Sequence, residues 1–198
     1  MIEKKLKTEG GAVIKGESLF NIPYWKIQVI NFEEKKKELT KLLESYPEEK
    51  SGFQYFFTNR TSDVSGLAEG FLSIMKEEIS ALSKEIKKDL AITSIWSLSY
   101  EKNDFHQPHN HGSTGITAIL YLDLPKESPV TEYVQPWNDF ATDLCPYNAL
   151  PVVEGDIVIV PSFVFHFSNP NQSNNKKRII SWDMKIILDI NQYRNSII

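Results

Sequence analysis

The sequence of 198 residues contains a single cysteine, Cys145. One thiol cannot form an internal disulfide, which excludes a small secreted scaffold held together by disulfides. The sequence also lacks the run of roughly 20 apolar residues that a membrane-spanning helix needs. Its first residues, MIEKKLKTEGG, contain no apolar core of a secretory signal. We therefore expect a soluble protein of the cytoplasm, without a membrane partner.

An excess of basic residues is absent as well. The 22 lysines and arginines are outnumbered by 26 aspartates and glutamates, and the formal net charge is −4. Proteins that bind nucleic acid ordinarily present a basic surface that displaces counterions, so no nucleic-acid partner is expected. Hydrophobic residues make up 41% of the chain, which is enough for a core without disulfides. The length is typical of one domain, and we expect one over residues 1–198.

The two halves of the chain differ in pattern. In residues 1–92, a strand at 24–30 precedes helices at 31–46 and 64–90, because apolar residues recur there at spacings of three and four. Residues 93–190 instead contain short alternating segments rich in β-branched residues. These predicted strands are 93–100, 116–123, 156–160, 163–168 and 178–188. Several short strands in succession predict a mainly β domain of the α+β class, a sandwich or barrel with helices on one face.

Residues 126–150 form a long connection without clear periodicity. Connections of this length inside a compact domain tend to be functional lids or to be disordered. This one contains Trp137, Phe140 and Tyr147, which favours an ordered covering loop. We expect it to form a lid over a binding site, with Trp137 as a candidate substrate contact.

The four histidines lie in two segments of the second half. His109 and His111 are two residues apart, so that in an extended chain their side chains point to the same face. His166 lies in an apolar segment, where its ring nitrogens need partners. Three imidazoles that meet would suit Fe, Zn, Cu or Ni, although an ordinary hydrogen-bonded core histidine is the simpler reading of each alone. We expect His106 either to contact the ligand histidines without binding the metal itself, or to be exposed to solvent.

Arg178 opens an apolar segment that continues to Asp183. An arginine that enters a buried strand is costly unless an anion meets it, and its planar fork fits a carboxylate. The alternative is a surface arginine that follows Lys176 and Lys177.

These segments together resemble the 2-oxoglutarate and Fe(II)-dependent oxygenases of bacteria and their phages, and more distantly the prolyl 4-hydroxylase branch. The resemblance rests on His109-Asn110-His111, Ile119–Leu122, Glu154-Gly155-Asp156 to Pro161-Ser162, His166 followed by Asn169-Pro170-Asn171, and Arg178-Ile179. It implies a double-stranded β-helix, or jelly roll, with helices packed on one face. It also implies a dioxygenase that uses O2 and releases succinate and CO2 while it hydroxylates a C–H bond of a peptide or small-molecule substrate.

The resemblance further assigns roles to single residues. His109, His111 and His166 would hold Fe(II), Arg178 would bind the distal carboxylate of 2-oxoglutarate, and Tyr121 would be a second contact to this cosubstrate. One departure concerns the metal, because the usual oxygenase site has two histidines and a carboxylate. His111 stands where Asp or Glu is usual, which leaves the metal one negative charge short.

Three other functions stay open from the residues. A cupin-type metal enzyme without 2-oxoglutarate would use the same histidines, and so would a zinc hydrolase or lyase. A non-enzymatic jelly-roll protein with a binding or structural role would use none of them. Arg178 separates these readings, because it has a role only where a diacid binds.

Overall fold

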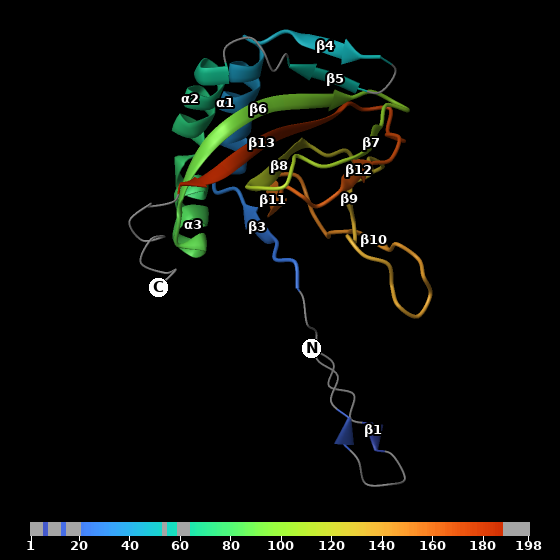
Figure 1. Ribbon diagram of the computed structural model, residues 1–198. Helices are drawn as coiled ribbons and strands as arrows, with labels where there is room; N and C mark the ends of the chain where they lie inside the picture. The colour runs from blue at the N-terminus through green and yellow to red at the C-terminus, as the bar shows by residue number, and fades with distance from the viewer. Residues whose placement is uncertain (1–5, 8–12, 15–20, 53–54, 59–63, 188–198) are drawn as a thin grey trace.

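The computed structural model describes residues 6–7, 13–14, 21–52, 55–58 and 64–187, and these residues form two antiparallel sheets, a separate small hairpin and three helices (Figure 1). The expected domain also includes residues 1–5 and 188–198, which lie outside the described residues. No helix in the described ranges is long and apolar enough to cross a membrane.

The larger sheet has seven strands, and neighbouring strands run antiparallel. In spatial order they are β3 (Trp25–Gln28), β11 (Asp156–Pro161), β8 (Ile116–Asp123), β13 (Lys177–Ile187), β6 (Asp89–Tyr100), β5 (Tyr55–Thr58) and β4 (Glu48–Ser51). The expected strand at 116–123 is confirmed to the residue. The small hairpin pairs β1 (Leu6–Lys7) with β2 (Val13–Ile14).

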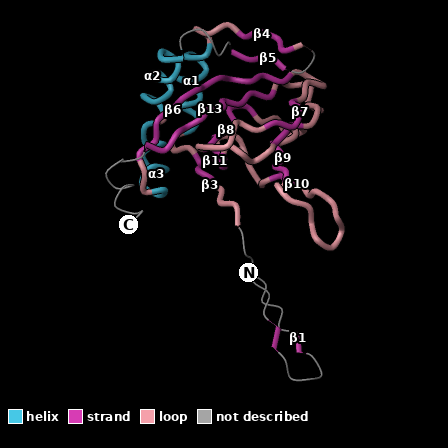
Figure 2. Tube along the Cα trace, in the orientation of Figure 1, coloured by secondary structure: helices cyan, strands magenta, loops and turns pink. Residues whose placement is uncertain are grey.

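Three helices cover one face of the larger sheet (Figures 1 and 2). They are α1 (Phe32–Leu43), α2 (Val64–Ile74) and α3 (Lys76–Ile86). Their apolar stripes pack on the sheet, where the ring of Phe71 lies 4.8 Å from that of Trp182. The helix expected over 64–90 is in fact two helices, separated at Met75, and the chain enters β6 at Asp89.

The smaller sheet packs against the face of the larger sheet that lies opposite the helices. Its strands, in order, are β10 (Tyr147–Ala149), β9 (Thr131–Val134), β12 (His166–Ser168) and β7 (His106–His109). Between the two sheets lies a second core that includes Trp96, Ile119, Tyr121 and Ile179. Two facing antiparallel sheets with helices outside confirm the expected jelly roll.

Strand alternation sorts the side chains of β13 between these two cores. Ile180, Trp182 and Met184 pack toward the helices, whereas Ile179 belongs to the core between the sheets. Residues two apart on a strand share a face. The odd-numbered residues from Lys177 to Asp183 therefore lie on the side of the smaller sheet, which carries His106, His109 and His166.

Candidate active site

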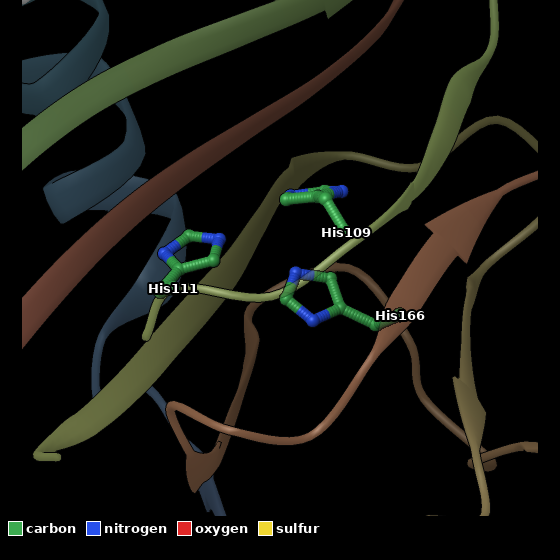
Figure 3. Close-up of side chains that lie close together, drawn as sticks. All are labelled: His109, His111 and His166. Atoms are coloured by element: carbon green, nitrogen blue, oxygen red, sulfur yellow. The ribbon is translucent and has the colours of Figure 1, made fainter. Parts of the chain in front are cut away.

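Three of the four histidines lie together between the two sheets (Figure 3). His109 ends β7 and His166 begins β12, and the two residues are direct partners in the sheet. His111 follows β7, and its backbone N–H donates to Ser162 O at 2.9 Å. The ring centroids are 4.5 to 5.2 Å apart. One ring nitrogen from each histidine lies within 4.8 Å of the other two, which is close enough for a common metal ion.

The Nδ1 atom of each ring lies within hydrogen-bond distance of an oxygen atom. The pairs are His109 with Gln107 O at 2.9 Å, His166 with Val164 O at 3.0 Å, and His111 with Asp183 Oδ1 at 2.6 Å. Carbonyl and ionised carboxylate oxygens only accept, so Nδ1 is the protonated nitrogen of each ring. A neutral imidazole with its proton on Nδ1 has its lone pair on Nε2, which is the tautomer of a metal-binding histidine.

Two further observations show that this donor set fits a metal ion. His111 Nε2 is buried and has no hydrogen-bond partner among the described residues, a costly arrangement that a metal ion would relieve. Burial, together with the nearby His109, lowers the pKa of His166 to about 3. That ring is therefore neutral at pH 7 and its lone pair is available. Three imidazoles suit Fe(II) as well as other transition metals.

A narrow pocket leads to the histidines. Its polar lining includes Tyr100, Thr131, Ser168 and Ser181. The free volume is about 10 Å³, about that of a single water molecule. A five-carbon diacid can therefore bind only if lining side chains move aside.

The fourth histidine forms part of the pocket wall. The ring of His106 stacks on that of His109 at 4.0 Å and lies 4.3 Å from that of Tyr55. Its Nδ1 lies 3.4 Å from the hydroxyl oxygen of Tyr100. His106 is thus next to the cluster of three and outside it.

The structure does not bring Arg178 to the histidines. Its side chain lies on the helix face of the larger sheet, where Nε donates to Asp123 and a guanidinium nitrogen lies 3.4 Å from Thr40 Oγ1 of α1. Asp123 is also paired with Lys36 of the same helix at 2.8 Å. In this structure the anion that meets Arg178 is a carboxylate of the protein itself.

The preceding residue, Lys177, lies on the side of the pocket. It is fully buried, and its Nζ donates to Pro129 O at 2.7 Å and to Ser168 Oγ at 2.8 Å. Nζ also lies 4.8 Å from the centre of the Tyr100 ring. Burial lowers the pKa of Lys177 to about 7, and within the described ranges no carboxylate forms an ion pair with it. Sequence reasoning passed over this residue as part of a surface run.

Asp183 is a second site residue that the sequence did not indicate. Burial alone would raise its pKa, but hydrogen bonds from His111, Ser94 and Thr117 hold the pKa below its ordinary value. The carboxylate is therefore ionised at neutral pH. It stands directly behind the ring of His111.

The other two predicted contacts, Tyr121 and Trp137, are not among the residues that line the pocket of the histidines. Tyr121 is buried on β8, and its hydroxyl oxygen accepts from the backbone N–H of Thr131 at 3.2 Å. Thr131, in turn, lines the pocket. Trp137 lies beyond β9 and is 47% exposed. It lines a separate cavity of about 660 Å³ together with Tyr24 and Tyr133.

Residues 94–183 match the protein family described as "Putative 2OG-Fe(II) oxygenase". Over this segment, which is slightly less than half of the chain, the protein is similar to the 2OG-Fe(II) oxygenase family. The segment contains His109, His111 and His166 and the central strands of the larger sheet, so the resemblance seen in the sequence is confirmed. No curated protein matches the chain. Of the functions left open by the sequence, the oxygenase is the one that the family match supports, with Fe(II), 2-oxoglutarate and O2 as its cofactor set.

Solved structures of other oxygenases share the fold. The non-heme alpha ketoglutarate dependent carbocyclase SnoK from nogalamycin biosynthesis is 18% identical, with a TM-score of 0.64 over 87% of this chain and 86% of that one. HygX from Streptomyces hygroscopicus, solved with nickel, 2-oxoglutarate and hygromycin B, is 11% identical, with a TM-score of 0.64 over 83% of each chain. A Pseudomonas putida prolyl-4-hydroxylase is 12% identical, with a TM-score of 0.55 over 83% of this chain and 93% of that one. At these identities the likeness concerns the fold.

Proposed function

We propose that this oxygenase hydroxylates a C–H bond of a small-molecule or peptide substrate, with His109, His111 and His166 as the ligands of Fe(II). The observation that carries the proposal is the meeting of three imidazoles, each with Nδ1 directed at an acceptor oxygen. When bound, Fe(II) and 2-oxoglutarate supply the oxidative decarboxylation that yields succinate and CO2 and transfers one atom of O2 to the substrate. Three imidazole ligands would leave the metal able to take 2-oxoglutarate and O2 as further ligands.

We further propose that Lys177, in place of Arg178, binds the distal carboxylate of 2-oxoglutarate. A buried ammonium group is costly without an anion, and Lys177 has only a carbonyl, a hydroxyl and a ring face as described partners. Two of these partners, Ser168 and Tyr100, line the pocket of the histidines. A carboxylate that displaced one of them would give the ammonium group its counter-ion.

We propose that the cavity lined by Trp137 binds the part of the substrate that lies farthest from the reacting C–H bond. Tyr133 lines this cavity and also lies beside the cluster, with its ring centroid 6.0 Å from that of His166. A substrate that reached past Tyr133 would bring its outer part against Trp137 and Tyr24. Trp137→Ala should then raise KM for the substrate and leave the affinity for Fe(II) unchanged; an unchanged KM would remove Trp137 from the substrate site.

A nucleic-acid substrate is not expected, and a cytoplasmic location stays a prediction.

Turnover of the cosubstrate tests the proposed function. The protein, loaded with Fe(II) under anaerobic conditions, is mixed with 2-oxoglutarate and air-saturated buffer, with and without a panel of amino acids, peptides and small metabolites. We expect succinate and CO2 in equal amounts, faster with a true substrate, and none from His166→Ala. Iron binding without consumption of 2-oxoglutarate would indicate a cupin-type metal enzyme. The absence of metal binding would indicate a jelly-roll binding protein.

A further inference from the structure

The three histidines differ in what stands behind them. His109 and His166 each donate through Nδ1 to a backbone carbonyl two residues earlier in the chain, Gln107 O and Val164 O. His111 instead donates to a carboxylate, Asp183 Oδ1, at the shorter distance of 2.6 Å. A carbonyl holds a ring in place, whereas a carboxylate also makes the ring more electron-rich and a stronger ligand. The one charged acceptor belongs to the one histidine that replaces the usual carboxylate ligand.

The position of Asp183 is built into the larger sheet. It pairs with Thr117 on β8 and with Ser94 on β6, and both hydroxyls donate to its carboxylate at 2.8 Å. Thr117 Oγ1 lies in turn 3.1 Å from Ser162 Oγ, and the carbonyl of Ser162 accepts from the backbone of His111. The carboxylate and the ring are thus held by the same small network.

Among the described residues, no lysine or arginine neutralises the charge of Asp183. Its side chain is 22% exposed. The negative charge therefore acts mainly on the ring of His111. Because the carboxylate is mostly buried, its field is weakened less than it would be at the open surface.

We propose that Asp183 is a positioning residue that supplies, through His111, the negative charge which the usual two-histidine, one-carboxylate set carries on the metal itself. This inference rests on the proposed function, because it assumes that His111 is a metal ligand. It explains how a site of three imidazoles compensates for the missing carboxylate. The charge lies one hydrogen bond behind the ligand.

Asp183→Asn separates the charge from the hydrogen bond. The amide oxygen can still accept from His111 Nδ1, so the ring keeps its place while the negative charge is lost. We expect the affinity for Fe(II), measured anaerobically by competition with a chelator, to fall by about 10- to 100-fold, the usual effect of losing such a partner. The matched control is Asp89→Asn, which removes the same charge at an exposed position on β6 and should leave the affinity unchanged.

A double variant distinguishes an effect of charge from a purely structural role of Asp183. It moves the carboxylate from position 183 to position 111, and its affinity for Fe(II) is the quantity measured. His111→Asp alone places two carboxylates side by side and should leave a poor site. Asp183→Asn combined with His111→Asp moves one charge from the outer position onto the metal, and should bind Fe(II) more tightly than either single variant. The unfolding midpoint of each metal-free variant shows whether it is folded.

The outcomes separate this inference from the proposed function. If the unaltered protein binds Fe(II), and folded Asp183→Asn binds it equally well, the role of Asp183 is refuted and the proposed function stands. If both single variants and the double variant bind equally weakly, the charge is again not the cause. If the unaltered protein binds no Fe(II), both proposals fall.

Discussion

Lys177 and Arg178 are neighbours on β13, yet their side chains lie on opposite faces of the larger sheet. The Nζ of Lys177 donates to Ser168 Oγ between the two sheets. The guanidinium of Arg178 reaches Asp123 and α1 on the other face. Since successive strand residues alternate in direction, only one of the two can face the histidines. The structure assigns that side to the lysine.

This pair gives the sharpest test of the cosubstrate site. Lys177→Met removes the buried ammonium group and should weaken binding of 2-oxoglutarate by at least about 10-fold, because hydrogen bonds to charged groups contribute about 1.5–3 kcal/mol. Arg178→Met removes the adjacent cation on the outer face and should change this affinity little. Isothermal titration of the Fe(II)-loaded protein under anaerobic conditions measures both.

The reverse result would restore the assignment made from the sequence. If Arg178→Met abolished 2-oxoglutarate binding and Lys177→Met left it intact, the diacid would have to lie on the helix face, away from the three histidines. Equal losses in both variants, together with a loss of metal binding, would point to a general loss of fold. The unfolding midpoint of each variant decides that case.

Lys177 should also make the stability of the metal-free protein depend on pH. Its pKa is about 7 in the folded protein and 10.5 in its ordinary state, so between these values the unfolded chain holds a proton that the folded chain lacks. The free energy of unfolding contributed by this group therefore rises with pH from about 7 to about 10, and is lowest below pH 7. Urea unfolding at several pH values measures the slope.

The difference between variants isolates the lysine from other titrating groups. Lys177→Met should show a flatter rise in the free energy of unfolding between pH 7 and 10 than the unaltered protein. Lys176→Met, which removes an exposed lysine one residue earlier, should keep the slope. If all three proteins showed the same slope, Lys177 would keep an ordinary pKa.

The turn between His111 and β8 offers a matched pair of glycines. Gly112 and Gly115 both have positive φ, of 107° and 94°. A Cβ at Gly115 would lie 2.6 Å from the carbonyl oxygen of Met184, whereas one at Gly112 would meet nothing within 4 Å. Gly112→Ala should therefore cost only the backbone strain, about 1–3 kcal/mol, and Gly115→Ala clearly more.

Chemical unfolding of the metal-free variants checks this order. Gly115→Ala should have the lower free energy of unfolding and should push β13 away from β8 at Met184. If Gly112→Ala were the more damaging change, the turn would be shaped by a contact that the structure does not contain.

Much of the fold was predictable because its strongest patterns are local. The strand 116–123 is buried on both faces and reads as a continuous apolar run, which ends at turn residues. The break at Met75 was not predictable, because the apolar spacing continues through it. The strands β7, β9 and β10 have only three or four residues each, too few for alternation to stand out.

The site was predictable where residue type alone carried the signal. Two histidines two apart and one histidine in an apolar strand indicated the cluster, and the strands β7 and β12 bring them together. Lys177 was missed because β13 is apolar on both faces, with Ile179 and Ile180 both buried. Alternation then cannot tell which of two adjacent cations faces the site. Only pairing with the other strands decides it.

Asp183 was missed for a related reason. Its partner His111 lies 72 residues earlier, and nothing in the sequence links the two. The alternation of the strand did contain a signal. Asp183 and Lys177 are six residues apart, an even number, so their side chains lie on the same face of β13. That signal becomes informative only once one of the two is placed at the site.

An anaerobic titration with Fe(II) and then 2-oxoglutarate, followed through the visible metal-to-ligand charge-transfer band, tests the central claim most directly. It compares the unaltered protein with single alanine variants of His109, His111, His166 and, as the matched control, His106. We predict that the band appears in the unaltered protein and in His106→Ala, and is lost in the other three variants. The claim would be contradicted if the unaltered protein gave no band, or if His106→Ala lost it while one of the other three kept it.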